Sequence, residues 1–97
     1  MITYAVLVNF TDQGIRAAKD TVKRAGAFTD MAKKFGVTTK EVFWTQGRYD
    51  IVVIVEAPDE LSATAASLSL SALGNVRTES LRAFSASDMK AIVANMG

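Results

Sequence analysis

Residues 51–55 of this chain, Ile-Val-Val-Ile-Val, form an unbroken apolar run of β-branched side chains. Such residues favour strands, and successive side chains of a strand point to opposite faces of its sheet. Both faces of this strand are therefore apolar, whereas a strand in an antiparallel sheet with one face in water alternates between apolar and polar residues. The run predicts a sheet that must be covered on both faces.

The remaining segments predict the order β-α-β-β-α-β followed by a terminal helix. Strand segments are rich in β-branched and aromatic residues, and helical segments show apolar residues at helical spacing. The expected elements are strands at 2–10, 38–46, 51–55 and 76–84, and helices at 13–35, 58–73 and 86–96.

The expected first helix, residues 13–35, contains a glycine in its middle. Ile15, Val22 and Ala32 recur at helical spacing and are expected on its apolar face. Gly26 either weakens the helix by about 1 kcal/mol relative to alanine or marks a close approach of another segment.

This order of elements predicts an α+β, ferredoxin-like fold. Two right-handed split βαβ units interlock into a four-stranded antiparallel sheet of strand order 4-1-3-2, with both helices on one face. The first and third strands would be central, and these are the two most apolar segments. A length of 97 residues fits a single domain over 1–97.

Two helices cover only one face of such a sheet, so the other face needs a second cover. In the first strand Tyr4, Val6 and Val8 share one side, and Ala5 and Leu7 share the opposite side. Whichever face the helices take, large apolar side chains remain on the other, beyond what soluble monomers usually expose. We expect the same face of a second copy to cover them, in a homodimer or a higher homo-oligomer.

The terminal helix offers an alternative cover. Ser85 and Asp88 have the spacing of a capping box at its start. The helix either folds back over the sheet of its own chain or is exchanged between subunits. Its apolar residues are Met89, Ile92, Val93 and Met96.

The composition excludes several classes of chemistry. The chain has no cysteine and no histidine, which removes thiol nucleophiles, disulfides, histidine bases and zinc sites built from these ligands. Asp12, Asp50, Glu56 and Asp59 lie near possible loop sites, but their spacing specifies no oxygen-ligand metal site. We expect no metal and no cofactor.

Charge and hydropathy limit the classes of partner that are expected. The net charge is +1, and residues 51–55 contain no aromatic or basic side chain for stacking bases, so no nucleic-acid partner is expected. Residues 1–35 carry a net +3 and residues 36–60 a net −3, either as solvated faces or as patches that steer self-association. No apolar run approaches the ~18 residues of a membrane span, and the N-terminal segment lacks signal-peptide features, so a cytoplasmic location is expected.

Residues 47–50, Gly-Arg-Tyr-Asp, lead into the apolar strand, which ends Glu56-Ala57-Pro58-Asp59. Together with residues 74–79 and 82–84, this pattern resembles the GYD domain family over almost the entire chain. The resemblance implies a ferredoxin-like subunit of the dimeric α+β barrel type. It implies little about activity, because these small bacterial and archaeal proteins mostly have no assigned reaction.

Within this motif each residue has a structural and a functional interpretation. Gly47 is expected to supply a positive φ in the connection between two strands. The Tyr49 hydroxyl lies in water or donates into a cleft. Asp50 either accepts backbone amides or pairs with Arg48, or it acts as a general base.

The leading functional interpretation is a small-molecule-binding or oligomeric assembly module. A pocket for a small apolar or amphipathic molecule is expected between the helices and the sheet or inside the barrel, lined by Tyr4, Trp44, Tyr49 and Asp50. The alternative is a cofactor-free enzyme, an isomerase or monooxygenase, in which Asp50 takes the proton and Tyr49 or Arg48 stabilises the oxyanion. The absence of histidine argues against the enzyme. A plain assembly domain would have no pocket.

Overall fold

The computed structural model describes residues 1–97 and shows the expected order of strands, with an additional break in the first helical segment. The elements are β1 (Ile2–Phe10), α1 (Asp12–Arg16), the 3-10 helix η1 (Ala18–Asp20), α2 (Thr21–Lys33), β2 (Thr38–Trp44), β3 (Ile51–Ala57), α3 (Glu60–Ala72), β4 (Val76–Ala83) and α4 (Ala86–Ala94).

The four strands form one antiparallel sheet in the order β2-β3-β1-β4, which confirms the expected topology. In the centre of the sheet Val6 of β1 lies opposite Val53 of β3 and Ser80 of β4. The two most apolar segments are therefore the two central strands.

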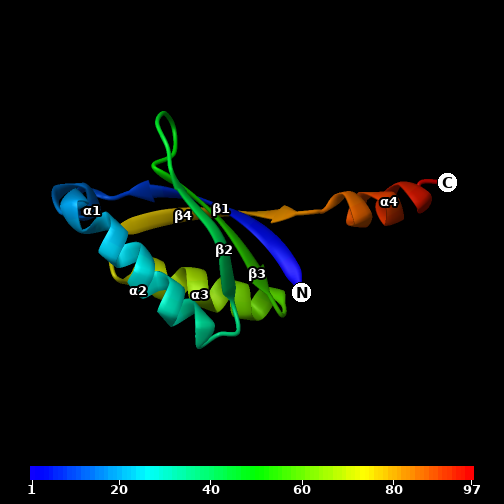
Figure 1. Cartoon of the computed structure of the whole chain (residues 1–97), viewed down its shortest axis with the longest axis horizontal. Helices are drawn as coiled ribbons and strands as arrows, with labels where there is room; N and C mark the ends of the chain where they lie inside the picture. Colours follow the sequence, from blue (N-terminus) through cyan, green and yellow to red (C-terminus); the bar gives the residue numbers. More distant parts are fainter.

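Helices α2 and α3 lie on the same side of this sheet (Figure 1). We call the side that they pack against the covered face. Along β3, every second residue is buried, beginning with Ile51 and ending with Ala57. The hydrophobic core lies between this face and the helices and consists of Val6, Val8, Ala32, Val37, Ile51, Val53, Val55, Ala57, Ala66 and Val76.

The single helix expected at residues 13–35 is instead three pieces. The Thr11 side chain caps α1, which ends at Arg16, and η1 turns the chain before α2 begins. Because of this break, the three residues expected on one apolar face do not share a face. Ile15 and Val22 are exposed (69% for Val22), whereas Ala32 is fully buried. Nothing lies within 4 Å of a side chain added at Gly26, so this glycine does not mark a close approach.

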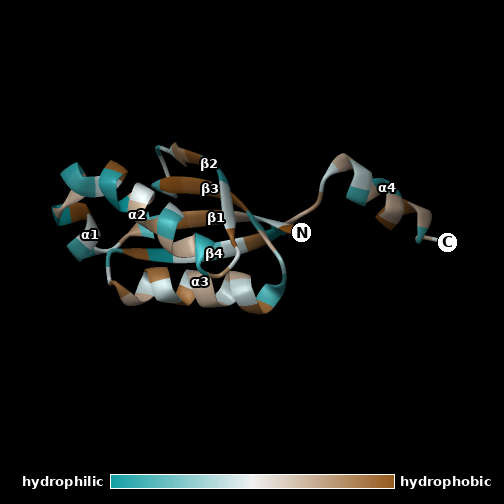
Figure 2. Cartoon of the chain, turned by 60° about the horizontal axis from the view of Figure 1, so that its bottom comes forward, coloured by the Kyte–Doolittle hydropathy of each residue, from teal (hydrophilic) through white to brown (hydrophobic).

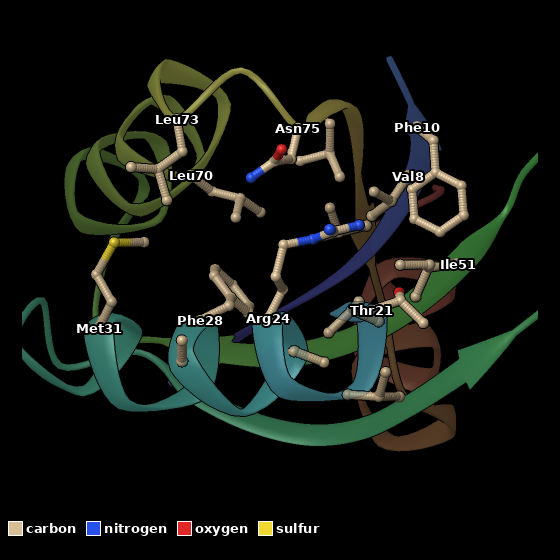
Figure 3. A pocket seen from close by; sticks show the side chains of 16 residues that line it. Val8, Phe10, Thr21, Arg24, Phe28, Met31, Ile51, Leu70, Leu73 and Asn75 are labelled. Atoms are coloured by element: carbon tan, nitrogen blue, oxygen red, sulfur yellow. The ribbon is translucent and has the colours of Figure 1, made fainter. Parts of the chain in front are cut away.

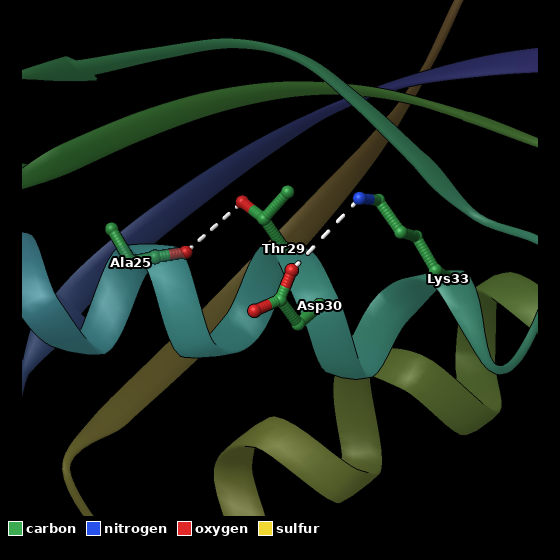
Figure 4. A network of polar contacts seen from close by, with 4 residues as sticks. All are labelled: Ala25, Thr29, Asp30 and Lys33. Carbon is green, nitrogen blue, oxygen red and sulfur yellow. Dashed lines mark hydrogen bonds and ion pairs between the residues drawn. The ribbon is translucent and has the colours of Figure 1, made fainter.

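Helix α2 carries part of the N-terminal positive charge. Lys33 Nζ lies 3.9 Å from Asp30 Oδ1, and the Thr29 hydroxyl donates to the Ala25 carbonyl at 3.0 Å (Figure 4). Both members of the ion pair are largely exposed, and such pairs contribute little to stability. This part of the basic segment is a solvated helix face.

The opposite side of the sheet, which we call the open face, carries apolar side chains with no helix over them. Phe43 is 55% exposed and Leu81 is 46% exposed. The strand pairings place Phe43 beside Val52 and Leu7, and Leu81 beside Ala5 and Ile54. Ala5, Leu7, Val52 and Ile54 are only partly buried.

Helix α4 projects away from the rest of the chain and does not cover the open face (Figures 1 and 2). Of the two alternatives for this helix, folding back over its own sheet is therefore wrong. Its expected capping box is present: Ser85 and Asp88 each accept a backbone hydrogen bond from the other. The projection gives a Cα radius of gyration of 14.5 Å, against about 12.5 Å for a compact chain of this length.

None of the helices combines the length and apolar character required to cross a membrane.

Candidate functional site

A cavity of about 330 Å³ lies between helices α2 and α3 and the covered face of the sheet (Figure 3). Its size is at the lower end of the range for small-molecule sites. Most of its walls are apolar, and its polar side chains are Thr21, Arg24 and Asn75. The apolar lining comprises Val6, Val8, Phe10, Ala25, Ala27, Phe28, Met31, Val42, Ile51, Val53, Leu70, Leu73 and Val76.

Side chains of helices α2 and α3 and of the sheet enclose the cavity. Ala25 of α2 lies over the sheet where Val8 and Val53 form the floor. Phe28 of α2 and Leu70 of α3 also line the cavity and pack against the hydrophobic core.

One end of the cavity is built by a close junction between α1 and the loop before β4. The Thr11 amide donates to the Asn75 carbonyl at 3.0 Å, and the Thr11 hydroxyl donates to the Gly74 carbonyl at 2.6 Å. A Cβ atom at Gly14 would lie 1.9 Å from the Asn75 carbonyl oxygen. Only glycine therefore allows this approach.

Arg24 extends from α2 along this end of the cavity. Its Nη1 donates to the Ala17 carbonyl at 2.8 Å and its Nη2 donates to the Gly14 carbonyl at 3.1 Å. Its guanidinium carbon lies 6.0 Å from the centre of the Phe10 ring, a cation–π distance. Arg24 has no carboxylate partner, since the chain's two ion pairs join other residues.

Trp44 and Tyr4 were predicted to line the pocket, and both lie on the covered face outside this cavity. Trp44 Nε1 donates to the hydroxyl of Thr21, which does line the cavity, at 2.9 Å. Tyr4 lines a separate groove between α3 and β4, where the Arg82 guanidinium lies 6.0 Å from its ring centre.

The motif residues lie at the connection between β2 and β3. Gly47 has a φ of 99°, which confirms the expected positive φ. The Asp50 carboxylate accepts the Phe10 amide at 2.8 Å, and the Asp50 amide donates to the Val8 carbonyl at 2.8 Å. Asp50 thus holds this connection to the end of β1, as in its structural interpretation, and forms no ion pair with Arg48.

The Tyr49 side chain points toward β4. Its hydroxyl lies 3.4 Å from Glu79 Oε2 of β4, and Arg48 is exposed. Neither Tyr49 nor Asp50 lines the cavity between the helices and the sheet. Ligand binding or catalysis by these residues stays a prediction.

Thr21, Arg24 and Asn75 were not predicted from the sequence as site residues. A signal was present, because Thr21, Arg24 and Phe28 follow one another at the spacing of a helix face. A charged residue on such a face is unusual, and it indicates a polar role within an apolar site.

Two carboxyl groups have a perturbed pKa, and both cap helices outside the cavity. The Ser62 amide donates to Asp59 at the start of α3 and lowers the pKa of that carboxyl below its ordinary value of 3.8. The Ser85 amide likewise lowers the pKa of Asp88 at the start of α4. No group of acidic side chains in the chain gathers in a way that could hold a metal ion.

Comparison with known proteins identifies the family. The family model described as "GYD domain" matches residues 4–93. The protein named "Glutamine synthetase and cystathionine beta-lyase binding protein" from Thermus thermophilus is 32% identical over 90 residues, which cover 92% of this chain and 95% of that protein. No solved structure matches. The matched segment contains the whole sheet except its first two residues, and the chain belongs to the GYD domain family.

Proposed function

We propose that this protein is a homodimeric binding module in which two copies pair through the open faces of their sheets, as a dimeric α+β barrel. The observation that carries the proposal is the apolar open face, on which Phe43 and Leu81 are about half exposed and nothing in the chain covers them. A two-fold axis lets one such surface cover an identical one.

The apolar side chains are numerous enough to hold two copies together. Each of the five side chains larger than alanine contributes up to about 1.5–3 kcal/mol when fully removed from water, and both copies bring the same six residues. Association costs about 4–15 kcal/mol, which these side chains can offset. The six residues are Ala5, Leu7, Phe43, Val52, Ile54 and Leu81.

Helix α4 extends the same surface. It has nine residues and no packing partner in its own chain, and isolated helices of this length are marginal in water. It follows directly after β4, whose Leu81 belongs to the open face. We expect α4 of each copy to lie against the other copy and to bury Met89, Ile92 and Val93 there.

The name of the Thermus thermophilus relative supports an assembly role. That protein is described as binding two enzymes, glutamine synthetase and cystathionine β-lyase. We propose by analogy that this dimer also acts by binding rather than by catalysis.

Small-molecule binding is a second candidate function, favoured by the cavity of about 330 Å³ beneath α2 and α3. A plain assembly domain needs no such space. The cavity lies on the covered face, so a ligand could occupy it in the dimer without competing with the second copy.

The enzyme alternative has less support from the geometry. Asp50 already accepts a backbone amide and does not line the cavity beneath α2 and α3, so it is poorly placed to take a substrate proton there. Loss of turnover in Asp50→Asn and Tyr49→Phe variants that keep the fold would favour the enzyme.

The dimer is tested by charging the open face. Ile54→Asp places a carboxylate at the centre of the proposed interface, and Leu61→Asp makes the same kind of change at a residue of α3 that is 84% exposed. Light scattering after size-exclusion chromatography should give a dimer for the unmodified chain and for Leu61→Asp, and a folded monomer for Ile54→Asp. A dimer that persists in Ile54→Asp would contradict the proposal.

A further inference from the structure

We infer that the cavity between α2, α3 and the sheet binds an apolar molecule that carries a carboxylate, and that Arg24 and Asn75 recognise that carboxylate. The inference rests on the small-molecule role proposed above and names the class of ligand.

Arg24 is the main reason. It is half-buried, and its only hydrogen-bond partners are the neutral carbonyls of Gly14 and Ala17. A guanidinium has five N–H donors, so three remain without a protein partner. A positive charge in an apolar site is costly unless an anion accompanies it, and carboxylates match the geometry of the guanidinium.

Asn75 supplies a second free donor. Gln13 Nε2 donates both to the Leu73 carbonyl and to Asn75 Oδ1, at 3.2 and 2.9 Å. The carbonyl of Leu73 fixes the orientation of the Gln13 amide, which in turn fixes that of Asn75. The Asn75 NH₂ group is left without a partner and, like Arg24, reaches into the cavity, from the opposite wall (Figure 3).

The third polar side chain of the cavity, Thr21, also has a free hydrogen-bond donor. The Thr21 hydroxyl accepts a hydrogen bond from Trp44 and donates none to the protein, so its proton is available. All three polar side chains of the cavity therefore present donors, and no acidic side chain lines it. This pattern favours a ligand whose polar end only accepts hydrogen bonds, as a carboxylate does.

The volume limits the size of the ligand. About 330 Å³ fits a single ring or a medium-length alkyl chain, while Phe28, Met31 and Leu70 provide apolar walls for it. A medium-chain or aryl carboxylate satisfies both the apolar walls and the donors.

The test compares octanoate with its neutral amide, octanamide, by titration into the labelled protein and by calorimetry. We expect octanoate to bind at least about tenfold more tightly and to shift the amide resonances of Phe28, Leu70 and Asn75. Asn75→Asp keeps the acceptor for Gln13 but replaces the free donor with a negative charge, so octanoate affinity should fall at least tenfold while octanamide affinity is retained.

Arg24→Gln should have the same effect, and Arg16→Gln provides a matched control, since it removes the same charge from an exposed residue of α1 outside the cavity. Thermal melts of each variant separate loss of binding from loss of folding. Equal affinity for both probes would overturn the carboxylate assignment and leave the cavity as a neutral site. No shift with either probe would overturn both this inference and the proposed small-molecule role.

Discussion

The two faces of the sheet are made by alternate residues of the same strands, yet their side chains are buried to different degrees. On β3, Val53 is 6% exposed beneath the helices, whereas its neighbour Ile54 points to the open face and is only partly buried. The covered face is completed by the chain itself. The open face carries apolar side chains beside Glu41 and Glu79 and has no cover, so the fold of one chain does not account for all of its apolar residues.

The largest difference between the faces should appear when the same charge is placed on each. Val53→Asp puts a carboxylate into the core without a partner, which costs about 3–5 kcal/mol or more, and we expect the chain to lose its folded structure. The Ile54→Asp variant should keep the circular dichroism spectrum of the folded chain and lose only the ability to form the dimer. If both variants unfold, the open face is part of the core of each chain and the comparison fails.

The covered face also depends on the close junction at Gly14. Gly14→Ala forces the Asn75 backbone to move, because its Cβ would lie 1.9 Å from the carbonyl oxygen. We expect a loss of about 1–3 kcal/mol, typical of overpacking, seen as a lower melting temperature. Gly26→Ala is the control, since its Cβ meets open space, and it should raise stability by about 0.5–1 kcal/mol. An unchanged melting temperature for Gly14→Ala would show that the junction is loose.

Removal of residues 85–97 tests whether α4 belongs to the open face. Because α4 packs on nothing in its own chain, the shortened chain should keep its fold and its unfolding midpoint under monomeric conditions. The dissociation constant of the dimer, measured by sedimentation at several concentrations, should rise about tenfold, which is equivalent to about 1.4 kcal/mol. Unchanged dissociation would mean that α4 takes no part in the assembly.

The smallest effect concerns acid sensitivity at the start of α3, on the covered side. The pKa of Asp59 is lowered by the Ser62 amide, so its contribution to stability is present above its ordinary value of 3.8 and is lost as the pH falls through the lower folded value. Asn also caps helices well but does not titrate. Melting temperatures from about pH 5 to about pH 2 should therefore fall less steeply for Asp59→Asn. Parallel curves would contradict this role.

The sheet could be predicted from sequence because its signals are local and periodic. The run at residues 51–55 and the alternation in the first strand specify which side chains share a face, and the structure places Val6 and Val8 on the covered face and Leu7 on the open face as expected. The break between α1 and α2 was missed, because it depends on the approach of Gly14 to Asn75, 61 positions away in sequence. Thr21 and Arg24 carried a local signal in their helical spacing, but Asn75 did not, because it joins them at one cavity only through the packing of the two helices on the sheet.

The most direct test of whether two copies pair through their open faces is the solution mass of the unmodified protein. Sedimentation velocity at micromolar concentration should give twice the chain mass of 10.4 kDa, or a larger even multiple, for a chain whose open face is buried against another copy. A single species of 10.4 kDa at that concentration, with the open face fully accessible to solvent, would contradict it.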